Sequence, residues 1–181
     1  MLTIRKVSPP PYQDIALLLQ DSFAERLREG LNFSCAIYNE EDVKRAFSKA
    51  TAIIGAYEES ELIGIVMLNQ VASKFGLRYA THENLAVASK SKGLGVASKM
   101  FSELCVTAKD NNLDFVLSDT AEGATSSVKY HLRNGFRLYG KRHFPGRNYN
   151  SVTFILPISW KGKLLSSWLG LKILGHFYAN K

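Results

Sequence analysis

The sequence predicts an α/β fold in which helices flank one mixed, twisted β-sheet, followed by a C-terminal amphipathic helical tail. Short apolar runs, typical of strands, alternate with longer stretches whose apolar residues recur at helical spacing. The resulting order is β-α-α-β-β-β-α-β-α-β-β. A strand–helix–strand unit at its centre implies parallel pairing inside an otherwise antiparallel sheet. The 181 residues, 46% of them hydrophobic, suffice to bury the core of one domain.

The first third of the chain predicts a strand, two helices and a hairpin. Leu2–Val7 alternates as a strand does, and Tyr12–Arg28 has apolar residues at helical spacing. A second helix is expected over about Glu40–Lys49, with acidic residues in its first turn. Ala52–Tyr57 and Leu62–Leu68 are apolar runs separated by a polar turn, which predicts two antiparallel strands.

The remaining elements follow a polar loop that we expect after the second of these strands. A strand over about Tyr79–Val87 leads into a strong helix over Gly95–Asn111. Phe115–Ser118 is a short strand of the buried type, and a helix over Ser126–Arg133 ends at the Asn-Gly pair that follows it. Two final strands, on either side of a long basic loop, are expected over Phe136–Gly140 and Ser151–Leu156.

The charge of the chain is unevenly distributed and divides the sequence into a domain and a tail. Residues 1–80 hold 9 Lys and Arg against 10 Asp and Glu, residues 81–156 hold 10 against 6, and residues 157–181 hold 4 against none. We expect one domain over residues 1–156 and a basic amphipathic tail over residues 157–181. An anionic ligand is expected in the second half. Nucleic acid is disfavoured, because the basic residues are not interleaved with aromatic residues in a recognition motif.

The two cysteines argue against a disulfide-stapled fold and against a metal site. Cys35 and Cys105 are far apart in the sequence, and they form neither a disulfide framework nor a metal-ligand spacing. We therefore expect no bound metal and a reducing, cytoplasmic location.

The segment most informative about function is Glu83–Ala97, which joins a predicted strand to a predicted helix. Gly93 and Gly95 keep side chains away from the turn. Backbone N–H groups at a helix N-terminus lack helical partners, and the helix dipole adds partial positive charge there. With Lys90 and Lys92 nearby, this turn predicts a pocket for a pyrophosphate or a similar anion. A plain helix start is the alternative interpretation.

Two motifs give the chain a resemblance to the GCN5-related N-acetyltransferase (GNAT) superfamily. Lys92-Gly-Leu-Gly95-Val-Ala97 resembles the family signature Arg/Gln-x-x-Gly-x-Gly/Ala, with lysine in the first position, and Leu85-Ala86-Val87 is similar to the preceding strand. Tyr130-His-Leu-Arg133-Asn-Gly135-Phe136 resembles a second motif, an aromatic residue followed by a basic residue and Gly-Phe. The order of the motifs and of the elements is similar to that of the family over about residues 1–156.

This resemblance implies a GNAT-like fold and an enzyme, an N-acetyltransferase that uses acetyl-CoA as its co-substrate. It also implies that Leu85, Ala86 and Val87 pair with the pantetheine arm, in a cleft where the fourth and fifth strands splay apart. A backbone N–H near Val87 would polarise the acetyl carbonyl. The amides implied to hold the CoA pyrophosphate are those of Lys92, Gly93, Leu94, Gly95, Val96 and Ala97.

Direct transfer to an amine in a ternary complex benefits from a general base and a general acid. Glu83 is the candidate base, because strand alternation puts it on the face of Leu85 and Val87 and because amine-acetylating family members have a glutamate at the corresponding place. A solvated carboxylate at a strand end is the alternative. For the acid, alignment with the family's tyrosine indicates His131, whereas residue type indicates Tyr130. These neighbours point about 100° apart on a helix, so only one can serve, and both stay open.

The acceptor is expected to be a primary amine of a small molecule. The basic loop before the last strand contains Arg142 and Arg147, which could bind a phosphorylated acceptor. Asp119 and Glu122 could bind a cationic amine instead, and a solvated basic loop is the third interpretation. The alternative acceptors are a protein N-terminus or a lysine. A non-catalytic acyl-CoA-binding sensor or scaffold is the rival function.

The tail over residues 158–181 combines apolar and basic residues and has no acidic residue. We favour a terminal helix that docks on the sheet or on a second subunit of a homodimer. The alternative is peripheral contact with a membrane surface through an interfacial helix. The apolar stretch is too short and too interrupted to span a bilayer.

Overall fold

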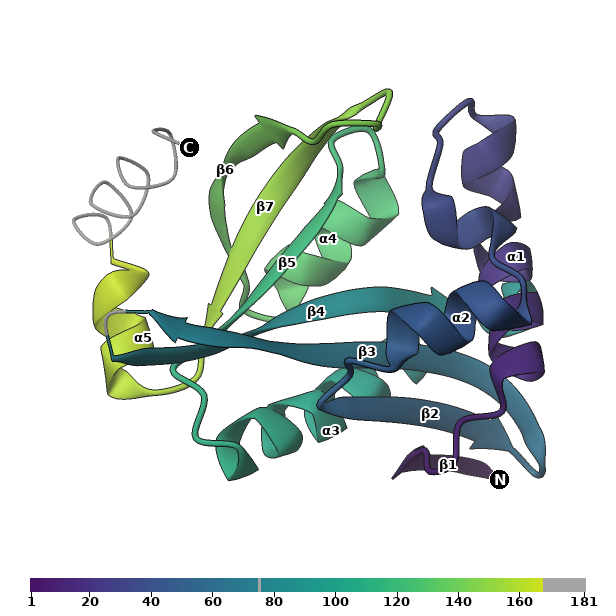
Figure 1. Ribbon diagram of the computed structural model, residues 1–181, viewed down its shortest axis with the longest axis horizontal. Coiled ribbons are helices and arrows are strands. Elements are labelled where there is room, and N and C mark those ends of the chain that lie inside the picture. Colours follow the sequence, from purple (N-terminus) through teal and green to yellow (C-terminus); the bar gives the residue numbers. More distant parts are fainter. Residues whose placement is uncertain (75, 168–181) are drawn as a thin grey trace. The chain divides into compact units, whose positions relative to one another are not determined.

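Seven strands form one sheet in the computed structural model, which describes residues 1–74 and 76–167 (Figure 1). Their order across the sheet is β1-β2-β3-β4-β5-β7-β6. The strands are β1 (Leu2–Lys6), β2 (Ala52–Glu58), β3 (Glu61–Lys74), β4 (Leu77–Val87), β5 (Phe115–Ala121), β6 (Arg137–His143) and β7 (Asn150–Pro157). The predicted α/β fold on a mixed sheet is confirmed, because α3 connects the neighbouring strands β4 and β5 as a crossover.

The helices lie where the apolar spacing predicts them, with short 3-10 turns between some of the elements. The α-helices are α1 (Tyr12–Arg28), α2 (Glu40–Phe47), α3 (Val96–Asp110), α4 (Thr125–Arg133) and α5 (Trp160–Leu165), and the 3-10 turns are η1 (Ser34–Ile37) and η2 (Ser89–Ser91). The predicted order of strands and helices is confirmed over the domain, and the predicted bounds of α1 match those observed.

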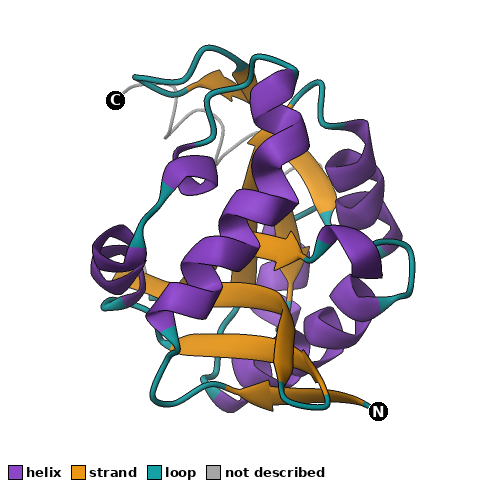
Figure 2. Cartoon of the chain, turned by 90° about the vertical axis from the view of Figure 1, so that its right-hand side faces the viewer, coloured by secondary structure: helices purple, strands orange, loops and turns teal. Residues whose placement is uncertain are grey.

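The chain divides into two compact units. The first contains Met1–Gln70 and His82–Thr107. In this unit β2 pairs antiparallel with both β1 and β3, and the N-terminus lies at the β1 edge of the sheet (Figure 2). A Cβ atom at Gly64 of β3 would lie 2.9 Å from Cε of Met100, so α3 packs closely on this strand. The fully buried side chains of the core include Ile15, Leu19, Val43, Ile54, Ile65, Met100 and Leu104.

The second unit contains Val71–Thr81 and the chain from Ala108 onward, and Asp114 connects its elements. The Asp114 N–H donates to the carbonyl of Arg78 at 2.6 Å, and the Asp114 carboxylate accepts the Arg78 N–H at 2.9 Å. The backbone N–H groups of Ile158 and Ser159 donate to the Asp114 carbonyl at 2.9 and 3.1 Å. The Ser159 hydroxyl donates to the Asp114 carboxylate at 2.6 Å, so one residue holds the starts of β4, β5 and α5.

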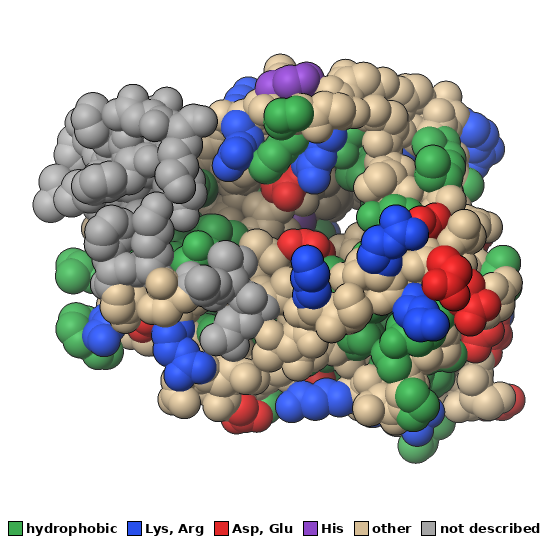
Figure 3. Space-filling model, in the orientation of Figure 1, with side chains coloured by type: hydrophobic (Ala, Val, Ile, Leu, Met, Phe, Trp, Pro, Cys, Tyr) green, Lys and Arg blue, Asp and Glu red, His purple; other side chains and the backbone are tan. Residues whose placement is uncertain are grey.

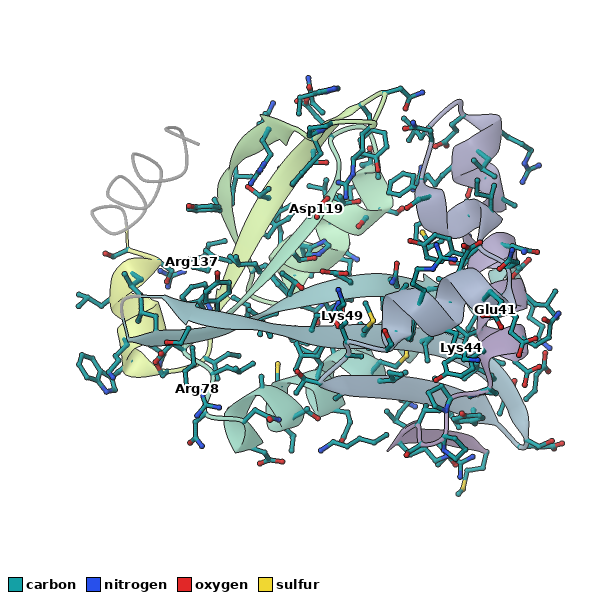
Figure 4. All side chains as sticks on the ribbon, viewed as in Figure 1. Glu41, Lys44, Lys49, Arg78, Asp119 and Arg137 are labelled. Atoms are coloured by element: carbon teal, nitrogen blue, oxygen red, sulfur yellow. The ribbon has the colours of Figure 1, made fainter. Side chains whose placement is uncertain are left out.

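The tail begins as a helix docked on the second unit. Arg137 of β6, labelled in Figure 4, donates to the carbonyl of Ser166 at 3.1 Å, just after α5. The side chains of Trp160 and Leu164 are 71% and 67% exposed. Residues 168–181 of the predicted tail lie outside the described residues, so its contact with a membrane or with a second subunit stays a prediction.

Two loop predictions are wrong. The polar loop expected after Leu68 is strand, because β3 continues to Lys74 and β4 begins at Leu77. The long basic loop is shorter than expected, since Lys141–His143 belong to β6 and pair with β7. Both segments are rich in polar residues, and exposed strands hold their backbone hydrogen bonds without the apolar alternation that reveals a half-buried strand.

The longest described helix is α1, with 17 residues. Among residues 1–74 and 76–167, no helix combines the length and the apolar character needed to cross a lipid bilayer.

We expect Gly162→Ala to destabilise the protein, because a Cβ atom at this position would lie 1.8 Å from the carbonyl oxygen of Asp114. Alanine in place of glycine inside a helix ordinarily stabilises by about 1 kcal/mol. Here the backbone clash reverses the sign, with an expected loss of about 1–3 kcal/mol in the free energy of unfolding. Urea denaturation measures this change.

The matched control is Gly123→Ala, since no heavy atom lies within 4 Å of its added Cβ. Its unfolding midpoint is expected to stay close to that of the wild type. A Gly162→Ala variant as stable as the wild type would contradict the docking of α5 on Asp114.

Candidate functional site

The turn from β4 into α3 has the geometry of an anion site. Gly93 and Gly95 adopt φ angles of +83° and +78°, a left-handed backbone that favours glycine. The Gly95 carbonyl accepts the Lys99 N–H at 3.1 Å, so Gly95 is the residue just before the helix. Serine or aspartate at this position would cap the next N–H groups with a side-chain oxygen, and glycine has none. The first N–H groups of α3 therefore point at an exposed turn with the positive end of the helix dipole.

The two lysines beside this turn are both tied to neighbouring elements of the first unit. Lys90 Nζ donates to the Glu61 carboxylate at 2.7 Å, and both side chains are exposed. Lys92 Nζ donates to the carbonyl of Ser22 in α1 at 3.2 Å. An exposed ion pair contributes little and exchanges readily with solvent or with another anion. Both lysines belong to the segment that leads into α3, so they add positive charge to this part of the chain.

The end of β4 is bound by α1, which the sequence reasoning did not anticipate. The Ala88 N–H donates to Ile63 of β3 at 2.9 Å. The Val87 N–H, which points to the other edge of the strand, donates to Oγ of Ser22 at 3.3 Å. The Ser89 N–H donates to the Asp21 carboxylate at 2.7 Å. Helical spacing locates α1, but it gives no signal for which polar residues of that helix reach β4.

These residues fit the phosphate groups and the pantetheine arm of CoA. The turn over Lys92–Gly95 is exposed, Gly95 has no side chain to cap the helix, and Lys90 and Lys92 belong to the segment that leads into it. The hydrogen bond from the Val87 N–H to the Ser22 hydroxyl is long, at 3.3 Å. An amide carbonyl of the pantetheine arm can therefore replace this hydroxyl as the acceptor.

Glu83 lies on β4 in the same unit as this turn, with an exposed side chain. Its carboxylate accepts a hydrogen bond from the side-chain amide of Asn69 at 3.2 Å. Asn84 has a φ of +51°, so the strand is not regularly extended immediately after Glu83. The predicted shared face with Leu85 and Val87 rests on regular alternation and stays a prediction. Irregular strand residues of this kind redirect neighbouring side chains and are frequent beside active sites.

His131 is a core residue of the second unit, with 2% of its surface exposed. Its ring stacks on Phe154, with 4.5 Å between centroids, and meets the edge of Phe136 at 4.9 Å. Nδ1 lies 2.7 Å from the carbonyl of Ser127, which can only accept, so Nδ1 carries the proton. Nε2 then accepts the hydroxyl proton of Ser118 at 2.8 Å in the neutral ring. Both ring nitrogens are engaged inside the protein.

Tyr130 precedes His131 on α4 and is half-buried. The two rings meet edge to face, with 5.3 Å between centroids. The Tyr130 carbonyl accepts the side-chain amide of Asn134 at 2.8 Å, which closes the helix C-terminus. The turn after Asn134 is completed by Gly135, whose φ of +81° explains the Asn-Gly stop signal in the sequence.

The predicted acceptor residues also lie in the second unit, and most of their charges are paired. Arg147 forms an ion pair with Asp119, which is labelled in Figure 4. Lys141 forms an ion pair with Glu122. Arg142 stacks on the ring of Phe144, with its guanidinium carbon 4.2 Å from the centroid. Acidic and basic side chains lie next to one another at several places on the face shown in Figure 3.

The predicted site residues thus form two groups. Glu83, Leu85–Val87 and Lys92–Ala97 belong to the first unit, and they lie on β4 or on the turn that follows it. The second unit holds the remaining candidates, which are Asp119, Tyr130, His131, Arg142 and Arg147.

Comparison with known proteins identifies the family and the fold of the chain. The model of the Acetyltransferase (GNAT) family matches residues 14–136. The chain matches no curated protein sequence. Solved structures with the same fold include the ribosomal-protein-S18-alanine N-acetyltransferase of Escherichia coli, with a TM-score of 0.70, 13% identity, and coverage of 88% of this chain and 95% of that one.

GNAT-family acetyltransferases of two further bacteria have the same fold. The protein from Staphylococcus aureus Mu50 has a TM-score of 0.70 and 11% identity, over 88% of this chain and 100% of that one. The protein from Streptococcus pneumoniae has a TM-score of 0.68 and 14% identity, over 88% and 100%. The chain belongs to the GNAT family of acetyltransferases, since the family model matches more than half of its residues.

Burial lowers the pKa of His131, although the Ser127 carbonyl and the Asp119 charge act in the opposite direction. The unfolded chain therefore takes up a proton on this residue at a higher pH than the folded protein does. We expect the free energy of unfolding to be fully retained above the ordinary histidine pKa of about 6.5 and to fall as the pH drops below it. The loss is about 1.4 kcal/mol per pH unit while only the unfolded state is protonated.

Urea denaturation from about pH 7.5 down to about pH 5 measures this slope. His131→Gln is the comparison, because glutamine does not titrate and retains one polar partner. The difference between the two slopes of unfolding free energy against pH gives the contribution of His131, separated from that of the other titratable groups. Identical slopes would show that His131 is not a buried neutral residue.

Proposed function

We propose that the protein transfers the acetyl group of acetyl-CoA to a primary amine of a small molecule, by direct attack in a ternary complex. The observation that carries this proposal is the glycine turn before α3, where two left-handed glycines form an exposed turn and provide no side chain to cap the helix. Membership of the GNAT family supports acetyl-CoA as the donor.

The turn and the end of β4 are proposed to hold the co-substrate. The N–H groups at the start of α3, with Lys90 and Lys92 beside them, would bind the pyrophosphate. The backbone of Leu85–Val87 would pair with the pantetheine arm, and an N–H of this segment would polarise the acetyl carbonyl. The thioester supplies an activated acyl group with a thiolate leaving group. The long hydrogen bond from Val87 to Ser22 is the one that such pairing would replace.

Glu83 is proposed as the general base. An alkyl amine has a pKa of about 10.4 and is mostly protonated at neutral pH, so it must lose a proton before it attacks. The Glu83 side chain is exposed, and its carboxylate accepts a hydrogen bond from the side-chain amide of Asn69. A carboxylate accepts several hydrogen bonds at once, so the amine or a bridging water would approach it from the solvent side.

Tyr130 is proposed as the general acid in preference to His131. The Nε2 atom of His131 accepts a proton from Ser118 and has none to donate, and burial lowers the pKa of the ring. A tyrosine hydroxyl keeps its proton at neutral pH and can give it to a departing thiolate. His131 would then hold α4 on β5, so that Tyr130 keeps its direction.

The acceptor is proposed to bind near Asp119, Arg142 and Arg147. The ion pair from Arg147 to Asp119 joins the loop before β7 to β5, which gives this surface a fixed shape. A protein N-terminus or a lysine side chain is the alternative acceptor.

The test is release of the CoA thiol from acetyl-CoA with a panel of amines, for the wild type and for Glu83→Gln. We expect release that depends on the amine and that falls by about a hundredfold in Glu83→Gln, the scale of losing a general base. Raising the pH should rescue the variant in part, because the free amine is then more abundant.

Glu58→Gln is the control, since Glu58 is an exposed carboxylate at the end of β2. It should leave the rate unchanged. Wild-type rates in Glu83→Gln would remove Glu83 as the base. CoA binding without thiol release for any amine or peptide would favour a sensor or scaffold over an enzyme.

A further inference from the structure

In the second unit, the face of the sheet opposite α4 carries polar residues near the loop between β6 and β7. Ser118 of β5 pairs with Phe154 of β7, and both contact His131 of α4, so they mark the covered face. Asp119 is the next residue of β5, so it points to the other face. Arg142 lies opposite Ser151 in the pairing of β6 with β7, and Ser151 lies two residues from the partner of Asp119. Asp119, Ser151 and Arg142 therefore share one face.

Both acidic candidates on this part of the molecule are already neutralised. Asp119 is paired with Arg147, and Glu122 is paired with Lys141. A cationic substrate would therefore have to displace Arg147 or Lys141 to reach either carboxylate. Three cations, those of Lys141, Arg142 and Arg147, lie in this region against two carboxylates. Within the described part of the chain, the one cation of these three without a carboxylate partner is Arg142.

The guanidinium of Arg142 makes no hydrogen bond or ion pair with the part of the chain that the structure describes. It instead lies over the Phe144 ring, with 4.2 Å from its central carbon to the ring centroid. Stacking holds a guanidinium by its flat face and leaves the N–H groups along its edge available. The side chain is exposed, so a ligand can reach these donors.

Arg147 lies over the same Phe144 ring, at 4.4 Å from the centroid. Its Nη1 atom donates to Asp119 and, at 2.8 Å, to Oγ of Ser151. Both hydrogen bonds use this one nitrogen, which leaves the Nε and Nη2 donors of Arg147 for a ligand. One aromatic ring thus holds two guanidinium groups in fixed positions, and one of them is further fixed by Asp119.

We infer that this cluster of Arg142, Phe144 and Arg147 binds a carboxylate or phosphate group of the acceptor, so that the substrate class is an amine that also carries an anion. The inference rests on the proposed function only in naming the ligand as the acceptor. Guanidinium groups bind carboxylate and phosphate with two parallel hydrogen bonds, which neutral and purely cationic amines cannot form. Pre-positioned side chains also lose less conformational freedom when the ligand binds.

The kinetic test compares amines in matched pairs: an amino acid with its carboxamide, and an amino sugar phosphate with the same amino sugar lacking phosphate. We expect the KM of the anionic member of at least one pair to be lower by about tenfold to a hundredfold, the range for hydrogen bonds to charged groups. The pair that shows the preference identifies carboxylate or phosphate as the group. Added salt should reduce the preference.

Arg142→Gln should remove most of this preference, because it should raise the KM of the anionic amine much more than the KM of its uncharged partner. Arg142→Lys keeps the charge without the paired donors and should recover only part of the loss. Arg133→Gln is the control, because Arg133 is an exposed arginine at the end of α4. Equal KM values within each pair, or an unchanged preference in Arg142→Gln, would overturn the inference.

A binding measurement separates this inference from the proposed function. The arginine side-chain resonances of nitrogen-labelled protein are followed during titration with the amino acid or the sugar phosphate, and Arg142→Gln assigns the Arg142 signal. We expect the Arg142 signal to shift with the anionic compound and not with its uncharged partner. A shift without any thiol release would sustain the anion site while contradicting the enzyme function, and no shift with any anion would overturn the site.

Discussion

The start of α3 imposes the constraint on which the rest of the site depends: its first backbone N–H groups have no carbonyl to accept them. Most helices satisfy such groups with a capping side chain, as Asn39 does for α2, where its side-chain oxygen accepts the Asp42 N–H at 2.9 Å. Gly95 cannot do this for α3. An exposed turn without a capping side chain, at the positive end of a 15-residue helix, favours an anion, and we propose that the CoA pyrophosphate is that anion.

The neighbouring hydrogen bonds show how the protein holds this turn in place. Asp21 and Ser22 belong to α1, yet they bind the backbone of β4 and its continuation at Ser89 and Val87. Lys92, which stands where the family signature has Arg or Gln, reaches back to the Ser22 carbonyl. The turn is therefore fixed from α1 on one side and from β3 on the other, through Ala88 and Ile63. A pre-formed turn binds an anion at a lower cost in conformational entropy than a mobile one.

Local signals in the sequence predict what depends on neighbours along the chain. The periodicity of the apolar residues, together with the turn residues, is enough to predict the order of the elements, the bounds of α1 and the glycine turn. Helix periodicity and left-handed glycines are local properties of the chain. The partners of a polar side chain are not local. Nothing near His131 in the sequence reveals that Ser118 binds its ring, and nothing near Arg147 separates its paired guanidinium from the unpaired one of Arg142. Glu83 is predictable only in part. The sequence predicts the strand on which it lies, but it does not predict the left-handed backbone of the next residue, Asn84.

Calorimetric titration of acetyl-CoA into the wild type and into Gly95→Val tests the central claim most directly. Valine cannot adopt the left-handed φ of Gly95 without strain, so the first N–H groups of α3 should move out of place. Gly30→Val is the control, because Gly30 also has a left-handed φ, of +81°, and lies in the turn after α1. We predict that acetyl-CoA binds the wild type and Gly30→Val with similar affinity and binds Gly95→Val at least about tenfold more weakly, a loss of about 1.4 kcal/mol. Equal affinity of all three proteins would contradict the assignment of this turn as the pyrophosphate site.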